Sequence, residues 1–448
     1  SDLDGASPAM SRLFFCFTAY SAFAFAVSIA DAPQFRSNPV NAENRLQLAN
    51  TAKQAVKNPA AYQSSQDEVK KFFNGYYFPL MTQADPNELG QLGKRRDDFF
   101  RQFMWKSSSA ALQSDLTTLT REYMQRVLVN PKYHPAVRYN AILMLGMLDA
   151  KYASESGGTR QPPQPLPEAN QILVKVVSAA GKHPSITPPL VIGALVGLER
   201  HARYADALPK PNVAAMESAL LSTLQQSKPY REMSSEVHQW MLEQAATAMA
   251  QLVGSANKGQ NVQALLDTVA NDKLELDTRC YVANLLNDLS LDGVPLQSDV
   301  AARPLVQLAD DVGDHEAAAA KEYEDLQVGP MRGRVRPARR NRRINDEPEK
   351  FERRGLIARL GYLRSGLRAL DPVAKDDAKT TIEGVLAAIN PVYSAARDDK
   401  TLDLDLTKQV RMMARDIERL AEPWNADVAP AADEPAAATA RGDSGLVR

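Results

Sequence analysis

The sequence predicts an all-α protein, a right-handed α-solenoid of stacked helix pairs that begins with an N-terminal helical cap. Good helix formers such as Ala, Leu, Gln, Glu and Arg dominate, and strand-like runs are scarce. Apolar residues recur at the helical period in one segment after another. Successive apolar second helices are separated by roughly 40–50 residues, an interval typical of helical repeats.

Composition sets broad limits on this chain. Its 448 residues suffice for two or three ordinary domains or for one extended repeat array. Hydrophobic residues make up 44% and charged residues 24%, as in a folded globular protein. The formal net charge of -1 gives no overall field that would indicate nucleic acid or a membrane surface as partner.

Residues 1–32 read as a few upstream residues followed by a signal peptide. Arg12 provides a basic start, Leu13 to Ile29 carries no charge, and Ala30-Asp31-Ala32 offers small residues at a cleavage site. We expect cleavage before Pro33 and a periplasmic or extracellular location. The alternative is an uncleaved membrane anchor, because the apolar run is nearly long enough to span a bilayer.

Export would leave Cys280 as the single cysteine of the mature chain. One thiol cannot form an internal disulfide or a cysteine zinc site, so stability must come from packed helices. Cys280 lies within a helical pattern and is expected to be a small core residue.

Residues 33–111 are expected to form the N-terminal helical cap. A first helix is predicted over 41–58, with Leu46, Ala49, Ala52 and Val56 facing inward. A second begins at Asp67 and is interrupted at Asn74-Gly75, and a third covers 87–106. An aromatic cluster in this region either binds a ligand or, as we favour, closes the open end of the array; it comprises Phe72, Phe73, Tyr76, Tyr77 and Phe78.

Residues 112–290 are expected to contain four helix pairs. In the first pair, Val137, Ala141, Leu145 and Leu148 form one buried stripe of the second helix. The predicted second helices cover 134–149, 187–203, about 237–252 and 277–289. The last superposes on the first, with Arg279 on Arg138 and Leu286 on Leu145.

Ala136-Val137-Arg138 and Asp277-Thr278-Arg279, each followed by a run of Ala and Leu, resemble the second-helix signature of HEAT repeats. The chain is therefore similar to HEAT and armadillo proteins, and its nearest likeness is to exported bacterial proteins with such arrays. Pro188-Pro189 departs from the signature because the arginine is missing. The resemblance implies a fold and no chemistry.

Residues 291–350 are expected to be a partly disordered insert with a sharp charge split. Acidic residues between Asp310 and Asp325 are followed by an arginine-rich arm, and this segment has little apolar surface to bury. Helical stripes return in residues 351–422, beginning with Leu356, Leu360, Leu363, Leu367 and Leu370. Residues 423–448 are expected to be a disordered tail.

Motifs of catalysis are missing from the sequence. It has no Gly-rich phosphate loop, no Gly-x-Ser-x-Gly and no His-Glu-x-x-His, and no two histidines have ligand spacing on one helix. We therefore predict no cofactor, no metal and no catalytic residue. His134 and His183 each precede a Pro and are expected to lie in inter-helix turns.

Three classes of function stay open. The first is a scaffold that binds a protein or peptide through polar residues of the second helices; these are Arg138, Asn140, Glu199, Arg200, Gln239, Glu243, Arg279 and Asn284. Arg138 and Arg279 are the weaker members, because the resemblance to HEAT repeats implies that arginines at this point often bond within the repeat turn and serve stability. The second is a polyanion binder that acts through the arginine-rich arm; its residues are Arg332, Arg334, Arg336, Arg339, Arg340, Arg342 and Arg343. The third is a helical-toroid polysaccharide-active enzyme that uses His134, Tyr139 and Asn140. We favour the scaffold.

Overall fold

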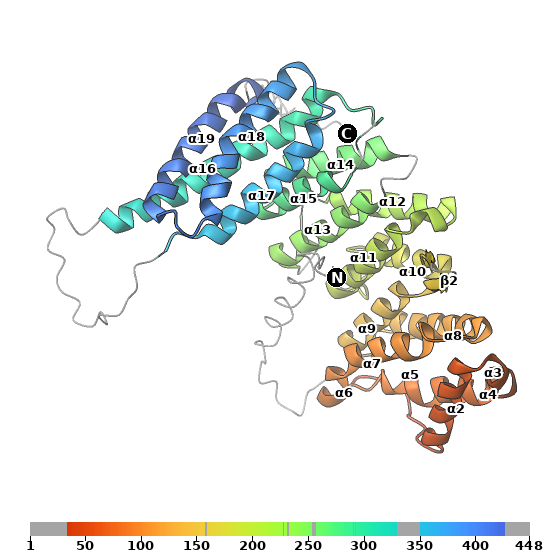
Figure 1. Cartoon of the computed structure of the whole chain (residues 1–448). Helices are drawn as coiled ribbons and strands as arrows, with labels where there is room; N and C mark the ends of the chain where they lie inside the picture. Colours follow the sequence, from red (N-terminus) through yellow and green to blue (C-terminus); the bar gives the residue numbers. More distant parts are fainter. Residues whose placement is uncertain are drawn as a thin grey trace, which may run out of the picture.

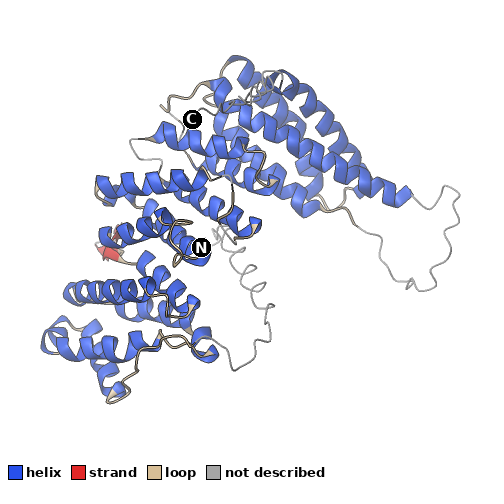
Figure 2. Ribbon diagram, turned by 180° about the vertical axis from the view of Figure 1, so that it is seen from behind, coloured by secondary structure: helices blue, strands red, loops and turns tan. Residues whose placement is uncertain are grey.

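The computed structural model describes residues 34–156, 159–226, 228–230, 233–252, 257–289, 291, 293–328 and 350–425. Over these residues the chain is almost entirely helical, which confirms the all-α prediction (Figure 2). The described strands form two small antiparallel pairs in the loop after the first repeat: β1 (Asp149–Lys151) with β4 (Gln164–Pro165), and β2 (Ser154–Ser156) with β3 (Thr159–Gln161). The predicted signal peptide, the arginine-rich arm and residues 426–448 lie outside the described residues.

The N-terminal cap is a set of short helices joined by two π-helical turns: α2 (Arg45–Lys57), α3 (Pro59–Ser64), α4 (Gln66–Phe72), η3 (Phe73–Tyr77), α5 (Phe78–Leu80), α6 (Pro86–Gly90), α7 (Leu92–Phe99) and η4 (Phe100–Met104). Gly75 does not interrupt the second helix as predicted, because the chain continues through η3 into α5. Phe72, Phe73 and Phe78 are buried, so the aromatic cluster packs inside the cap. Leu46 was expected in the buried stripe but is 72% exposed, at the first turn of α2.

Residues 110–288 form paired helices that stack in chain order: α8 (Ala110–Val129), α9 (Pro135–Gly146), α10 (Pro167–Ser178), α11 (Pro188–Ala202), α12 (Lys210–Leu224), α13 (Ser235–Gln251), α14 (Lys258–Ala270) and α15 (Leu276–Leu285), with short 3-10 turns η5 (Ala205–Ala207) and η6 (Leu286–Asp288). Each helix packs on its pair partner. In addition α9, α11, α13 and α15 pack successively in one row, and α10, α12 and α14 in the other (Figure 1). We call the row of α9, α11, α13 and α15 the second row, and the row of α10, α12 and α14 the first row.

Local sequence explains where these helices begin and end. Asn130 ends α8 in an extended conformation, and the His134 side chain accepts a hydrogen bond from the Ala136 N–H to cap α9. Pro135 occupies the first turn of α9, where its missing N–H costs nothing. The predicted stripe Val137, Ala141, Leu145 and Leu148 is buried, with at most 2% of any side chain exposed. Cys280 is fully buried, as expected.

The second row is held at close range by glycines. A Cβ built on Gly146 would lie 2.7 Å from the Gly197 Cα, and one built on Gly197 would lie 2.9 Å from the Gly146 Cα. Both distances are too short for real atoms, so α9 and α11 approach to a separation that only glycine allows. These two positions therefore fix the distance between the first two members of the row.

Four long helices close the fold: α16 (Ser298–Val328), α17 (Arg353–Leu370), α18 (Asp376–Arg397) and α19 (Asp403–Asn425). They pack together as a bundle, with α16 against α19, and α17 also packs on α15 (Figure 1). We therefore add α16 to the first row and α17 to the second. The final helix includes Trp424 and ends at Asn425, two residues beyond the predicted start of the tail at residue 423.

The acidic run Asp310 to Asp325 lies on α16, which corrects the prediction that it belongs to a mobile insert. Its helix has a fully buried apolar face that includes Leu305, Leu308 and Val312. Four of the acidic side chains find partners on other helices: Asp310 accepts from Asn425, Asp311 pairs with Arg279, Glu316 with Arg359 and Glu324 with Arg411. These acids are therefore engaged by the folded part of the chain.

No helix within the described ranges has the length and apolar character needed to cross a bilayer.

Candidate functional site

Arg138 and Arg279 are the two candidates for which bonding within the repeat turn is the alternative to facing a partner, and both are buried and hold the repeat turns. Each side chain is 5% exposed. The Arg138 Nε donates to the Leu128 carbonyl at 2.9 Å, and the Arg279 Nε donates to the Val269 carbonyl at 2.7 Å. These carbonyls belong to the last turns of α8 and α14, where backbone oxygens lack helical partners. Both arginines therefore cap the preceding helix, ten residues earlier in each case.

Each of these arginines also reaches forward to the next part of the array. The Arg138 Nη2 donates to the Ser185 carbonyl at 2.7 Å, just before α11, and the Arg279 Nη1 lies 2.7 Å from an Asp311 carboxylate oxygen on α16. In the third pair, His238 occupies the corresponding place, since its Nε2 donates to the Gln226 carbonyl at 3.1 Å after α12. Side chains of different type thus make the same inter-helix bond.

Three more of the predicted partner-binding residues, Asn140, Gln239 and Glu243, are also buried between helices. Asn140 is 3% exposed, and its Oδ1 accepts from the Arg96 Nη1 at 3.1 Å. Gln239 and Glu243 are 5% and 8% exposed, and the Thr278 hydroxyl of the next second-row helix lies 3.0 Å from an oxygen of each. The prediction that these five side chains are presented to a partner is therefore corrected: they join neighbouring helices.

Glu199, Arg200 and Asn284 remain partly exposed on the second row. Arg200 pairs with the nearly buried carboxylate of Asp149 at 2.6 Å. Burial raises the pKa of Asp149, and the hydrogen bond and charge of Arg200 oppose that shift. Glu199 pairs with Arg203, whose side chain is half exposed. Of the predicted partner-binding residues, Glu199 and Asn284 are therefore the two that a partner could contact without breaking a buried ion pair or hydrogen bond.

Two tyrosines of the second row were missed by sequence reasoning. The rings of Tyr281 on α15 and Tyr362 on α17 meet edge to face, with centroids 5.9 Å apart. The Tyr281 hydroxyl lies 2.9 Å from the Thr247 hydroxyl on α13, and burial raises the Tyr281 pKa. Tyr281 stands at the position of Asn140 when the two second helices are superposed, so that same superposition could have identified it.

The residues suggested for a toroid enzyme do not converge. His134 accepts from the Ala136 N–H, packs edge to face on Phe35 and has a pKa lowered by burial. The Tyr139 ring lies against Gly193, so close that a Cβ built on this glycine would touch it. Asn140 accepts a hydrogen bond from Arg96. His183 lies in its turn, with its Nδ1 2.8 Å from the Ser185 hydroxyl. These contacts leave no shared reacting position among the three nominated side chains.

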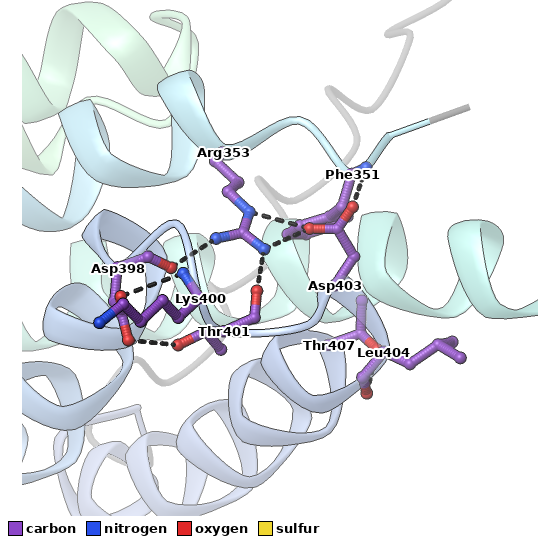
Figure 3. Close-up of polar contacts among 8 residues, drawn as sticks. All are labelled: Phe351, Arg353, Asp398, Lys400, Thr401, Asp403, Leu404 and Thr407. Carbon is purple, nitrogen blue, oxygen red and sulfur yellow. Dashed lines mark hydrogen bonds and ion pairs between the residues drawn. The ribbon is translucent and has the colours of Figure 1, made fainter. Parts of the chain in front are cut away.

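The chain enters α17 through a polar clamp around Arg353 (Figure 3). The Arg353 Nε donates to an Asp403 carboxylate oxygen at 2.8 Å, and its Nη atoms donate to the Asp398 and Thr401 carbonyls. The other Asp403 oxygen accepts from the Phe351 N–H at 3.2 Å. This clamp fixes the chain just after residue 349. The predicted polyanion-binding arginines Arg332 to Arg343 lie outside the described residues, so their role stays a prediction.

The described ranges contain no group of three His, Cys, Asp or Glu side chains arranged to hold a metal ion. What the second row offers is a partly exposed surface of mixed polarity, with carboxylate, amide and tyrosine groups. The chain matches no known family, no curated protein and no solved structure in the three comparisons made.

Proposed function

We propose that the chain is an exported, non-catalytic scaffold, a right-handed α-solenoid of HEAT-like helix pairs that binds a protein or peptide along its second row. The observation that carries the proposal is the ordered packing of second-row helices from α9 to α17. Stacked repeats of this kind extend a binding surface in proportion to their number. The matching backbone contacts of Arg138 and Arg279 support the assignment of equivalent repeats.

A polypeptide suits the exposed part of this row better than a small molecule does. Glu199, Asn284 and Tyr362 are partly exposed on three different helices, so the groups are distributed and do not converge in one pocket. Tyrosine beside mixed polar groups is typical of protein interfaces. Affinity for such a surface comes from many contacts with a few anchors.

The test uses two sets of three lysine substitutions each. The first set is Glu199→Lys, Asn284→Lys and Tyr362→Lys on the second row. The control set is Gln125→Lys, Gln171→Lys and Gln260→Lys, at exposed positions of α8, the first helix of the first pair, and of the first-row helices α10 and α14. Cross-linking and pull-down from the exported fraction should lose a partner with the first set and keep it with the control. Equal capture by both sets, with unchanged thermal stability, would place binding elsewhere.

Export needs its own measurement, because the pull-down from the exported fraction presupposes it. N-terminal sequencing of the protein made in its own host should find Pro33 as the first residue. A product that retains Leu13 to Ile29 would favour the membrane anchor.

A further inference from the structure

A small cavity lies where the N-terminal segment crosses the turn between α8 and α9. The Arg36 N–H donates to the Lys132 carbonyl at 2.8 Å, which fixes the segment against this turn. The cavity has a volume of about 280 Å³ and is lined by Arg36, Asn38, Tyr123, Arg126, Val127, Asn130 and Tyr133. Tyr123 and Tyr133 are buried, whereas Arg36 and Arg126 are exposed. The cavity therefore has an aromatic floor and a cationic rim.

The hydrogen bonds in the floor have a defined direction. The Tyr133 hydroxyl donates to the Asn38 Oδ1 at 2.7 Å, and the Asn38 Nδ2 donates to the Tyr123 hydroxyl oxygen at 2.5 Å. The Tyr123 proton then has no acceptor among the described residues. Burial, the largest effect, raises the Tyr123 pKa to about 12, so this proton is present at neutral pH. Asn130 uses its Oδ1 to accept from the Lys132 N–H, which leaves its Nδ2 as a further donor.

The rim carries two positive charges and no negative one. The Arg36 guanidinium carbon lies 5.5 Å from the Tyr133 ring centroid, and that of Arg126 lies 5.7 Å from the Tyr123 ring centroid. Within the described ranges neither arginine has a carboxylate partner, and no Asp or Glu lines the cavity. Arg121, which lies on α8 like Arg126, differs from both cavity arginines because it pairs with a carboxylate, that of Glu122. Guanidinium groups fixed over aromatic rings are well suited to bind oxyanions.

We propose that this cavity is a binding site for a small organic dianion, held by Arg36 and Arg126 with the Tyr123 hydroxyl and the Asn130 amide as further donors. The dianion is either a phosphate monoester or a dicarboxylate, because both present two charges and several acceptor oxygens. The volume admits a few carbon atoms beyond one phosphate or carboxylate group. The site is separate from the second-row surface and does not depend on the scaffold proposal.

Isothermal titration calorimetry of the full chain at low salt tests the proposal. The probes are inorganic phosphate, succinate and, as a monoanion, acetate. We expect at least one dianion to bind at least tenfold more tightly than acetate, and affinity to fall as salt is added. The variant Arg36→Gln/Arg126→Gln should weaken dianion binding at least tenfold. Arg121→Gln, which removes an arginine of α8 that does not line the cavity, should change it less than twofold.

The results either identify which type of dianion binds or show that the cavity is not a dianion site. Binding of phosphate alone assigns a phosphate group, and binding of succinate alone assigns a dicarboxylate. If no dianion binds more tightly than acetate, or if Arg121→Gln weakens binding as much as the double variant, the proposal is wrong. Thermal unfolding must first show that all variants remain folded. Tyr123→Phe, which removes one donor without a change in charge, should weaken binding about threefold.

Discussion

The repeat region α8–α15 and the C-terminal bundle α16–α19 satisfy their charged side chains in different ways. In the repeats, the buried arginines Arg138 and Arg279 donate to backbone carbonyls ten residues earlier in the chain. Ion pairs occur there as well, since Arg200 binds the nearly buried carboxylate of Asp149 and Arg279 also reaches Asp311 on α16. In the bundle, Arg359 on α17 binds carboxylates from distant segments, Glu316 at 2.6 Å and Asp277 at 2.7 Å. Arg353 similarly reaches Asp403, fifty residues later.

This difference indicates where each region is vulnerable. A carbonyl that loses its donor stays neutral, whereas a buried carboxylate that loses its arginine is left as an uncompensated charge. The bundle should therefore depend strongly on a few ion pairs, whereas the repeat region, apart from the Arg200–Asp149 pair, should depend more on close packing of its helices. The following variants test this contrast, from the largest expected effect to the smallest.

Removal of Arg359 should have the largest effect on stability. Glu316 is almost fully buried, with 3% of its side chain exposed, while the Arg359 side chain is 19% exposed. Arg359→Met leaves the Glu316 charge without its partner, so we expect the free energy of unfolding to fall by about 3 kcal/mol. Urea denaturation of the purified chain measures this change.

The control is the double variant Arg359→Met/Glu316→Gln, which removes the buried charge along with its partner. It should recover about half of the lost stability, because a neutral amide costs less to bury than a carboxylate. A loss below about 1 kcal/mol for Arg359→Met alone would contradict the proposed dependence on ion pairs.

Close packing in the repeat region is tested by Gly197→Ala. The new methyl group would lie 2.9 Å from the Gly146 Cα, which is backbone and cannot rotate away. Because α9 and α11 would have to separate, we expect a loss of about 1–3 kcal/mol despite the higher helix propensity of alanine. Gly90→Ala is the matched control, since nothing lies within 4 Å of its built Cβ. Differential scanning calorimetry should show a lower transition temperature for Gly197→Ala alone.

A third variant tests a buried histidine of the repeat region. Burial, together with the charge of Arg200, lowers the pKa of His201 from 6.5 to about 3. As pH falls through 6.5 the unfolded chain binds a proton that the folded chain cannot, so stability is lost as pH decreases. His201→Gln should remove this contribution, about 1.5 kcal/mol between pH 6.5 and about pH 5. If the free energy of unfolding falls equally with pH in His201→Gln and in the original chain, then the buried His201 is not the cause of this pH dependence.

Local patterns predicted much of the fold. The stripes of α9 and α17 have the helical period, and Val137, Leu145, Leu356 and Leu363 are buried as expected. The acidic run on α16 could not be assigned in this way, because its partners come from other helices. Glu316, for example, is bound by Arg359, 43 residues later. Such pairing depends on tertiary structure, which a reading of charge along the chain does not contain.

The site was predicted less well, for the same physical reason. Superposition of two second helices identified Arg138 and Arg279, and the likeness to HEAT repeats implied bonds within the repeat turn. It did not identify the acceptors, which are the carbonyls of Leu128 and Val269. The dianion cavity joins Arg36 to Arg126, which are far apart in sequence and show no common motif. Only the crossing of the N-terminal segment over the α8–α9 turn brings them together.

The smallest effect is expected for Arg419→Gln, which tests whether burial, and not ion pairing as such, decides the contrast. Arg419 pairs with Asp416 on α19, in the same bundle as Arg359, but the two side chains are 74% and 50% exposed. Water and salt screen such a pair, and its formation restricts two long side chains, so we expect a change below about 0.5 kcal/mol. Asp416 also remains solvated when its partner is removed, unlike Glu316. Urea denaturation at low and high salt should give nearly equal stabilities for Arg419→Gln and the original chain. A loss as large as that of Arg359→Met would show that every ion pair of the bundle matters equally, and burial would no longer explain the difference between the two regions.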